Sequence, residues 1–574
     1  MIKNRHWLTR HPTLATLAIF ILGYGLIVTL AYPFWSSAYP VFDEILPLLV
    51  SSHFDLKFWF LQSYSDFYTL YPEWSKTQHN VLRPAAHVWF WLLTQFAGGD
   101  VTAPGAYRLM LLGSYAWQAG CAGLVFYVAY RLCRRSLLVS MGLSGVMLFS
   151  PAVTSFPVNQ LAAFSLDIIA AGLVGLCLIA VAHRRAFLAG LWALLAVLTK
   201  TNALPPVLLL ACITLVDPMR RRIGLWVLLA PVIWGLTRLV AFGSLIGGGP
   251  QSGRFRPFNW EIILHYPFDV LVTNHFLDGL VMAIFICTNI AVWICTVTLL
   301  AGHIRSIRQN TRQWLHSRMM NRDPGEFVTM TAGLLSLGII PYILFIDMTI
   351  DYRIRFGAIP TLLILFWASG LRIASTVSHV VIAMLLIGSM IFAVIQYRTD
   401  FWTAQARFLS DRGRALDALI RRIDREKPGR QIYLANDVAL LGVSNSYLER
   451  WTGAASIIRL SGVLMPFKHR DKEGAYSPVL KKQPDRWIFT AHLTGGNKFT
   501  LSGTSIDKIL ETRDKGSNCF VRNAYYRYCF NNFRYVSEND YSFGDQIQIE
   551  ILHPPDNTVL IAYDFKQSRY VVLG

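Results

Sequence analysis

The sequence is poor in charged residues. Only 15% of its 574 residues are Asp, Glu, Lys or Arg, whereas about a quarter of the residues of a soluble domain are charged. Hydrophobic residues make up 54% and aromatic residues 13%. Apolar runs of about twenty residues, enough to cross a bilayer, recur before the chain becomes polar near Asp400. The composition excludes a soluble globular protein and predicts a polytopic α-helical membrane protein.

Acidic residues are the scarcer of the two charged kinds. The sequence has 34 Asp and Glu residues and 53 Lys and Arg residues, which gives a formal net charge of +19. In a membrane protein, Lys and Arg collect in cytoplasmic loops. The excess is therefore explained by topology, and we expect membrane lipids rather than nucleic acid as partners.

Several ligand-binding motifs are missing. The sequence has no G-x-G-x-x-G, no P-loop, no C-x-x-C and no Cys/His cluster with zinc spacing. It therefore predicts neither a nucleotide cofactor nor a metal. It also has no N-x-S/T sequon, which is compatible with a bacterial inner membrane.

Hydropathy predicts eleven membrane spans, at about 13–32, 107–130, 137–150, 160–182, 186–199, 203–216, 223–246, 278–301, 327–346, 356–373 and 377–396. Alternate threading from a cytoplasmic N-terminus puts every dense arginine cluster on the cytoplasmic side, as the positive-inside rule requires. These clusters lie at 131–135, 184–185, 220–222 and 305–322. The alternative for the first run is a secretory signal cleaved near Ser36-Ser37-Ala38.

The same threading puts a long loop, 33–106, and the chain beyond Asp400 on the outer face. Aromatic runs in this loop, such as "RPAAHVWFWLLTQFAGG", suit helices in the membrane interface. From 400 to 574 the composition changes to that of a soluble α+β domain. It opens with a helical pattern that ends before Pro428, and five strand-like runs follow. We predict a membrane domain at 1–399 and an extracytoplasmic, or periplasmic, domain at 400–574.

An acidic pair, Asp43–Glu44, lies shortly after the first span. One interpretation is a solvated loop pair that anchors the end of the helix. The other is a general base, which must come within about 3 Å of the hydroxyl that it deprotonates. Adjacent side chains point in different directions, so only one of the two is expected to act as the base.

Lys200, in "LLTKTNALPP", separates two apolar runs. One interpretation is a surface lysine that snorkels to the interface. In the other interpretation, Lys200 forms a polar site with Thr199, Thr201 and Asn202 that binds an anionic headgroup. A charge at membrane depth is costly, so it is expected to have such a role.

Arginines also occur in the outer loops, where the positive-inside rule predicts few cations. Guanidinium groups bind phosphate oxygens well. The candidates for binding a phosphate are Arg83, Arg254, Arg256, Arg353 and Arg355, together with Lys200. A base and several cations on one membrane face suit attack on a lipid-linked phosphate leaving group.

Four elements in this order resemble the GT-C superfamily of membrane glycosyltransferases, such as protein O-mannosyltransferases and the aminoarabinose transferases of lipid A. They are "FDE" after the first span, "LRPAAHVWFWLLTQFAGG" with "YRLCRR" after it, "LLTKTNALPPVLLL" and "DYRIRFGAIPTLLIL". The resemblance covers about residues 10–400. It departs from several members at "LRP", where they have Lys-Pro, and the C-terminal domain has no counterpart.

The resemblance implies a polyprenyl-phosphate sugar donor, inverting transfer on the extracytoplasmic face, and Asp43 as base with Glu44 second. The acceptor is a glycan, lipid or protein.

Alternatives to a GT-C glycosyltransferase are a polymerase or ligase of lipid-linked glycans, a transporter or flippase, and a phosphoethanolamine-type transferase. Transporters bury charges mid-span, ligases have their large loop late in the chain, and the last class needs a zinc site.

Cys519 and Cys529 are the two cysteines in clearly polar sequence. On the outer face they would meet an oxidising compartment, where a disulfide closing a short loop is expected. The alternative is two free thiols on paired strands.

Overall fold

The computed structural model describes residues 12–36, 38–40, 48, 54, 59, 83–154, 166–242, 323–344, 358–371, 375–398, 401–435, 449, 452–454, 456–459, 478–492, 498–500, 519–521, 526–530, 534–537, 540–542, 546–564 and 566–574. The chain divides into two compact units. The first comprises Met1–Ala38, Val50–Asp66 and Ser75–Arg407, and the second comprises Tyr39–Leu49, Phe67–Trp74 and Phe408–Gly574. The second unit thus takes in two segments of the predicted outer loop 33–106.

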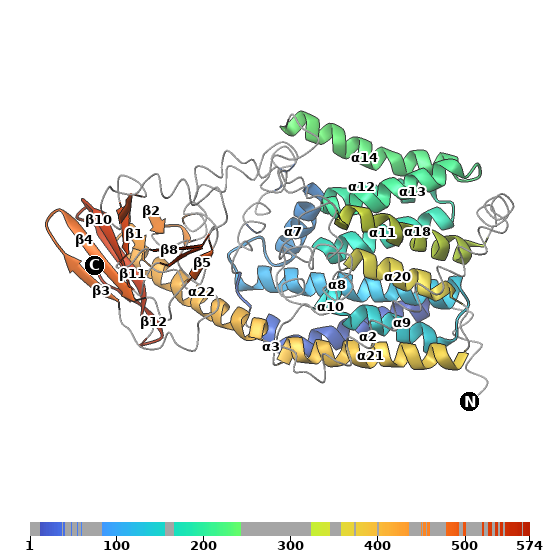
Figure 1. The fold of residues 1–574 in the computed structure, drawn as a ribbon, viewed down its shortest axis with the longest axis horizontal. Coiled ribbons are helices and arrows are strands. Elements are labelled where there is room, and N and C mark those ends of the chain that lie inside the picture. Colours follow the sequence, from blue (N-terminus) through green and yellow to red (C-terminus); the bar gives the residue numbers. More distant parts are fainter. Residues whose placement is uncertain are drawn as a thin grey trace. The chain divides into compact units, whose positions relative to one another are not determined.

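Unit 1 is a helical bundle (Figure 1). Its helices in the described ranges are α2 (Pro12–Leu30), α3 (Tyr32–Trp35), α7 (Pro84–Phe96), α8 (Pro104–Tyr127), α9 (Leu137–Phe149), α10 (Pro151–Thr154), α11 (Leu166–Ala182), α12 (Ala186–Thr199), α13 (Leu204–Val216), α14 (Arg221–Phe242), α18 (Pro324–Leu344), α20 (Ala358–Gly370) and α21 (Ser375–Arg398). Short π- and 3₁₀-helices, Val128–Leu132 and Thr201–Ala203, follow α8 and α12. Ten of these helices coincide with predicted spans, and the predicted span 278–301 lies outside the described residues.

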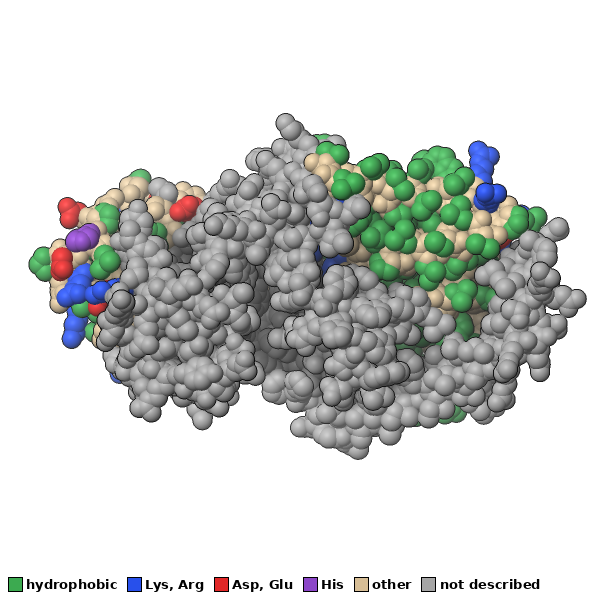
Figure 2. Space-filling view, turned by 45° about the horizontal axis from the view of Figure 1, so that its top comes forward, with side chains coloured by type: hydrophobic (Ala, Val, Ile, Leu, Met, Phe, Trp, Pro, Cys, Tyr) green, Lys and Arg blue, Asp and Glu red, His purple; other side chains and the backbone are tan. Residues whose placement is uncertain are grey.

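Three helices in the described part are long and apolar enough to cross a membrane, at Thr13–Leu30, Gly105–Leu132 and Arg221–Val240. Six more apolar helices are shorter. The bundle is built around α11, whose residues are nearly all buried. By contrast, α14 exposes Leu225, Trp226, Leu229, Leu236 and Val240. Figure 2 shows apolar side chains gathered on the described part of one face of the bundle. Such a face suits contact with lipid chains, and the bundle is that of a membrane protein.

Among the described residues, the predicted cytoplasmic loops at 131–135, 184–185 and 220–222 lie at one end of the bundle, here called the arginine end. Tyr127 Oη and His183 Nε2 are 3.0 Å apart at the ends of α8 and α11. Arg135 Nε donates to Ser369 O at 2.7 Å, and its Nη2 donates to Leu371 O. The arginine end therefore joins loops that are far apart in the sequence.

The start of α18 also lies at the arginine end. A Cβ on Gly325 would come within 2.3 Å of Leu132 O, so only glycine permits this approach. The Arg220 guanidinium lies 4.0 Å from the centre of the Phe327 ring. These contacts fix α18 beside the end of α8 and the loop before α14.

Unit 2 contains most of α22 (Phe401–Glu426) and three sheets. The helix buries Leu416, Ile420 and Ile423 on one face, spaced by four and three residues. The predicted boundary at 399 and 400 precedes α22, but the unit boundary falls inside this helix, at Phe408. Because α22 is continuous, its first turns belong to unit 1 and the remainder to unit 2.

The four-stranded sheet has the order β12-β11-β1-β2, with β1 (Gln431–Leu434), β2 (Ser456–Arg459), β11 (Thr558–Asp564) and β12 (Arg569–Val572). Strand β1 pairs in parallel with both β2 and β11. Strand β11 is buried along its whole length, which explains its apolar sequence.

The five-stranded sheet has the order β3-β4-β10-β7-β6 and the three-stranded sheet the order β5-β9-β8. Their strands are β3 (Val479–Lys482), β4 (Arg486–His492), β5 (Lys498–Thr500), β6 (Cys519–Val521), β7 (Tyr526–Phe530), β8 (Arg534–Ser537), β9 (Asp540–Ser542) and β10 (Gln546–Leu552). All pairs in these two sheets are antiparallel. The five predicted strand-like runs correspond to β1, β4, β10, β11 and β12.

Candidate functional site

Lys200 lies in a buried polar group with Asp167 and Asn202. Lys200 Nζ is 2.5 Å from Asp167 Oδ2, and Asn202 Nδ2 donates to Asp167 Oδ1 at 2.9 Å. Lys200 is 4% exposed and Asp167 is fully buried. The interpretation of Lys200 as a surface lysine that snorkels is therefore wrong.

Local structure explains how the three side chains meet. Helix α12 ends at Thr199, and Lys200 follows in an extended conformation, at φ −154° and ψ 134°. Asn202 then lies in the short 3₁₀-helix before α13, and Asp167 lies in the first turn of α11. Helices α11 and α12 pack against each other, and Cys177 Sγ donates to Ala189 O at 3.3 Å. The end of α12 is thus brought to the start of α11.

This group lies at the end of the bundle opposite the arginine end. Helix α12 begins beside Arg185 and reaches Lys200 after 14 residues, which is about 20 Å of helix. Asp167 is likewise the whole length of α11 away from His183. We call this second end the lysine end.

Asp167 is the member of the group that sequence reasoning missed. A signal was present, because Asp167 is the one acidic residue in the predicted span 160–182. A charge within an apolar run is expensive and usually has a partner. Pairing with Lys200 spans 33 residues, so the partner itself could not be read from the sequence.

His87 lies on α7, which packs against α8, and Arg83 is the residue immediately before this helix. Arg83 is half-buried and precedes the helix, and His87 is 2% exposed. Burial, and the positive charge of Arg83, lower the pKa of His87 to about 3. His87 also lies near the ring of Trp59, with the ring centres 6.2 Å apart. His87 is therefore neutral at physiological pH and lies beside an aromatic ring.

The other predicted site residues, Asp43, Glu44, Arg254, Arg256, Arg353 and Arg355, lie outside the described residues. Two residues that flank the acidic pair are described, Tyr39 and Leu48. Both are buried, at 5% and 1% exposure. Of the six predicted phosphate ligands, the structure thus describes Lys200 and Arg83.

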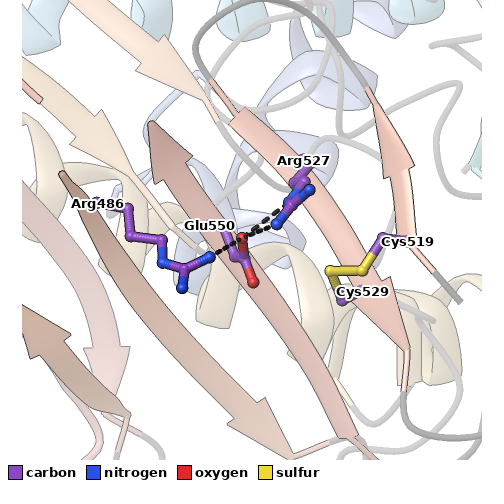
Figure 3. The surroundings of a disulfide bond; sticks show 5 residues. All are labelled: Arg486, Cys519, Arg527, Cys529 and Glu550. Carbon is purple, nitrogen blue, oxygen red and sulfur yellow. Dashed lines mark hydrogen bonds and ion pairs between the residues drawn. A yellow bond between two sulfur atoms is a disulfide. The ribbon is translucent and has the colours of Figure 1, made fainter. Parts of the chain in front are cut away.

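Cys519 and Cys529 form a disulfide in unit 2 (Figure 3). They face each other on β6 and β7. On the neighbouring strand β10, Glu550 accepts from Arg527 Nη2 at 2.7 Å and lies 3.5 Å from Arg486 Nη1. The disulfide and this charge group link four strands of the five-stranded sheet.

Among the residues that the structure describes, no cluster of three or more His, Cys, Asp or Glu side chains could hold a metal ion.

No protein-family model matches the sequence. No curated protein matches it either. Three solved structures of the oligosaccharyltransferase from Archaeoglobus fulgidus are similar to it. One is AglB in complex with an inhibitory peptide and a dolichol-phosphate, at 11% identity and a TM-score of 0.38, covering 77% of this chain and 65% of that one.

The second is the enzyme in complex with Zn and sulfate, at 10% identity and a TM-score of 0.37, covering 77% of this chain and 67% of that one. The third is tethered to an acceptor peptide, at 9% identity and a TM-score of 0.38, covering 77% and 65%. This chain thus spans about two thirds of the length of these neighbours. A likeness this low carries no conclusion about activity.

Proposed function

We propose that this chain is a membrane glycosyltransferase of the GT-C type. It transfers a sugar from a polyprenyl-phosphate donor to a hydroxyl of a glycan, lipid or protein acceptor, with inversion, on the extracytoplasmic face. The observation that carries the proposal is the buried Lys200 group at the end of the bundle opposite the arginine end. Its support from the sequence is the order of the four GT-C-like elements, of which the Lys200 turn is the third.

In this proposal, Asp43 is the general base that takes the proton of the acceptor hydroxyl, with Glu44 as the second candidate. An alcohol has a pKa far above physiological pH, so a positioned proton acceptor favours attack on the sugar. The bond from the sugar carbon to the phosphate oxygen breaks, and the leaving phosphate takes the electron pair. Cations near this oxygen stabilise its developing charge.

The Asp167–Lys200 ion pair changes how much each cation contributes to binding the phosphate. Because Asp167 lies 2.5 Å from the Lys200 ammonium, its negative charge offsets much of the attraction of Lys200 for a phosphate. We therefore assign most of the phosphate binding to Arg353, Arg355, Arg83, Arg254 and Arg256. Lys200 contributes a fixed hydrogen-bond donor rather than a full charge.

Mass spectrometry of lipid that co-purifies with the protein tests the donor class. We expect a polyprenyl phosphate or its sugar-linked form. Neutralising variants at Arg353 and Arg355 should reduce the amount retained. If only bulk phospholipids are found, and none of a panel of polyprenyl-phosphate monosaccharides binds, the donor assignment is wrong.

The variant Asp43→Asn tests the base, because it keeps the size of the side chain and removes its basicity. Sugar transfer should fall by about a hundredfold or more, while folding and lipid retention persist. Glu44→Gln is the matched control and should have a smaller effect. Normal transfer by Asp43→Asn together with loss in Glu44→Gln would reverse the two roles. Normal transfer by both variants would show that neither Asp43 nor Glu44 is the general base.

We further propose that the protein lies in a bacterial inner membrane, with its N-terminus cytoplasmic and unit 2 periplasmic. The Cys519–Cys529 disulfide supports a periplasmic location for unit 2, since disulfides persist in oxidising compartments. Thiol labelling of intact cells with an impermeant reagent should modify these cysteines after reduction. Labelling that requires a permeabilised membrane would reverse the topology.

A further inference from the structure

Helix α14 carries one ionisable residue beyond its first turn, Arg238. This arginine is 5% exposed. It continues a row of buried residues spaced by three or four positions, which are Ile223, Val227, Ala230 and Trp234. The opposite face of α14 is the exposed apolar one, and the helix packs against α12 and α13 (Figure 1). Arg238 therefore belongs to the face that packs on the bundle, not to the face that suits lipid chains.

Arg238 lies at the lysine end of the bundle, nearly level with Lys200. Helices α12 and α14 both begin at the arginine end, and a Cβ on Gly190 would come within 3.0 Å of Trp226 O. From Gly190 to Lys200 the chain rises about 15 Å, and from Trp226 to Arg238 it rises about 18 Å. The two cations are thus at about the same height along the bundle.

The guanidinium of Arg238 does not reach for the surface. Its Cζ lies 5.2 Å from the centre of the Trp234 ring, one turn earlier in the same helix. The side chain therefore runs back toward the middle of α14, whereas a snorkelling arginine would extend toward the interface. A charge inside a membrane bundle is costly, and a cation–π contact offsets only a small part of that cost. Such a residue usually marks a binding site.

Trp234 supplies a second hydrogen-bond donor at the same place. It is 8% exposed, and its buried indole N–H makes no hydrogen bond within the part of the chain that the structure describes. By contrast, Trp35 Nε1 donates to Val28 O at 2.9 Å. An indole N–H only donates, and a guanidinium has five donors and no acceptor. Two such groups side by side favour a ligand that is rich in acceptor oxygens.

We propose that Arg238 and the Trp234 indole N–H form a binding site for the phosphate group of a membrane lipid. A phosphate carries negative charge and several acceptor oxygens, and arginine can bind it through two parallel hydrogen bonds. Arg238 lies near the end of the span Arg221–Val240, at the level where the headgroups of a bilayer begin. Neither residue lies in the four GT-C-like elements, so the site goes beyond the cations proposed for the donor.

The test uses the full-length protein in detergent and three variants. Arg238→Gln removes the charge, Trp234→Phe keeps the ring and removes the N–H, and Arg222→Gln is the matched control. Arg222 is exposed in the first turn of the same helix, so its loss changes the net charge equally. The probes are polyprenyl phosphate, phosphatidylglycerol, inorganic phosphate and the neutral polyprenol. Binding is measured as the rise in melting temperature of each protein above its own value without ligand.

We expect Arg238→Gln to bind at least one of the two phosphate lipids about tenfold more weakly than the parent chain, because hydrogen bonds to a charged group are lost. Trp234→Phe should weaken the same binding about threefold. Arg222→Gln should bind like the parent chain, and polyprenol should bind all four proteins equally. If Arg238→Gln does not fold, Trp234→Phe decides the matter, since it removes a single N–H.

Equal binding of both phosphate lipids by the parent chain and by Arg238→Gln overturns the inference. An equal loss of polyprenol binding also overturns it, because the variant would then have disturbed contacts with the lipid chain. If inorganic phosphate binds as tightly as either lipid and depends equally on Arg238, the site is one for free phosphate, and the assignment to a lipid is wrong.

The same titrations separate this inference from the proposed function. If polyprenyl phosphate is the lipid that depends on Arg238, the inference is supported and the two residues join the donor site. If the parent chain binds no polyprenyl phosphate, the donor assignment is wrong, and phosphatidylglycerol alone decides the inference. A tenfold loss of phosphatidylglycerol binding in Arg238→Gln then supports it, and unchanged binding overturns it.

Discussion

Two buried ion pairs stabilise the two ends of the helical bundle, and they are built differently. At the arginine end, Asp217 and Arg220 are three residues apart in one turn, with Asp217 Oδ2 2.6 Å from Arg220 Nη1. At the lysine end, Asp167 and Lys200 come from different helices, 33 residues apart. The first pair forms from local chain geometry, whereas the second requires α11 and α12 to be packed.

The surroundings of the two pairs differ as well. Asp217 also accepts from the Met219 backbone N–H at 2.9 Å, and Arg220 stacks on Phe327. In the Lys200 pair, Asp167 also accepts from Asn202 Nδ2 at 2.9 Å, and the pair lies among apolar helices. Loss of one partner should therefore be more damaging at the lysine end, where the pair joins two helices and the remaining carboxylate, Asp167, is fully buried.

The largest effect is expected from Lys200→Met, which leaves Asp167 charged and buried. We expect a loss of about 3–5 kcal/mol in the free energy of unfolding. It should appear as a large drop in melting temperature in detergent. The double variant Lys200→Met with Asp167→Leu should recover most of the stability, because no buried charge remains. Equal instability of the single and double variants would show that the pair is not the cause.

Arg220→Gln makes the corresponding change at the arginine end and should cost about 2–3 kcal/mol. Asp217 keeps its bond from Met219, so its charge remains partly compensated. Sugar transfer per folded molecule should be unchanged, because Arg220 lies at the end of the bundle opposite Lys200. If Arg220→Gln lowers stability more than Lys200→Met does, the claim that the lysine end is the more sensitive is wrong.

Arg135→Lys is expected to have a smaller effect, of about 1–2 kcal/mol. A lysine has a single nitrogen and cannot reproduce the two bonds that Arg135 makes to the carbonyls of Ser369 and Leu371. The change loosens the attachment of α20 at the arginine end. Cleavage by protease near residue 371 should increase, while cleavage in unit 2 should not.

The smallest effect concerns pH, through His87 on α7. Because the pKa of His87 is lowered to about 3, from about 6.5 unfolded, the unfolded chain binds the proton more tightly. The contribution of His87 to stability is therefore full above about pH 6.5 and is lost as pH falls toward 3. His87→Phe should make the melting temperature less dependent on pH between pH 4 and pH 6.5. A variant as sensitive to acid as the parent chain would refute this explanation.

Much of the fold was predictable from the sequence. Long apolar runs predict helices because an unpaired backbone is too costly in a bilayer, and ten predicted spans coincide with helices of the structure. The α22 helix follows from the spacing of Leu416, Ile420 and Ile423, and its end follows from Pro428. Alternating or continuous apolar runs likewise predict β1, β4, β10, β11 and β12. These are local properties, which the chain expresses without distant partners.

The candidate site was only partly predictable. Lys200 was identified because a lysine between apolar runs is unusual, and the polar residues around it are its neighbours in sequence. The sequence by itself thus determined the membrane class, the helices and strands, and the residues that are unusual for their surroundings. Only the tertiary structure paired Lys200 with Asp167, Arg135 with the end of α20, β1 with β11, and Tyr39 with Ser410. Each of these contacts joins segments more than thirty residues apart, and it forms only when packing has offset the entropy of closing the intervening chain.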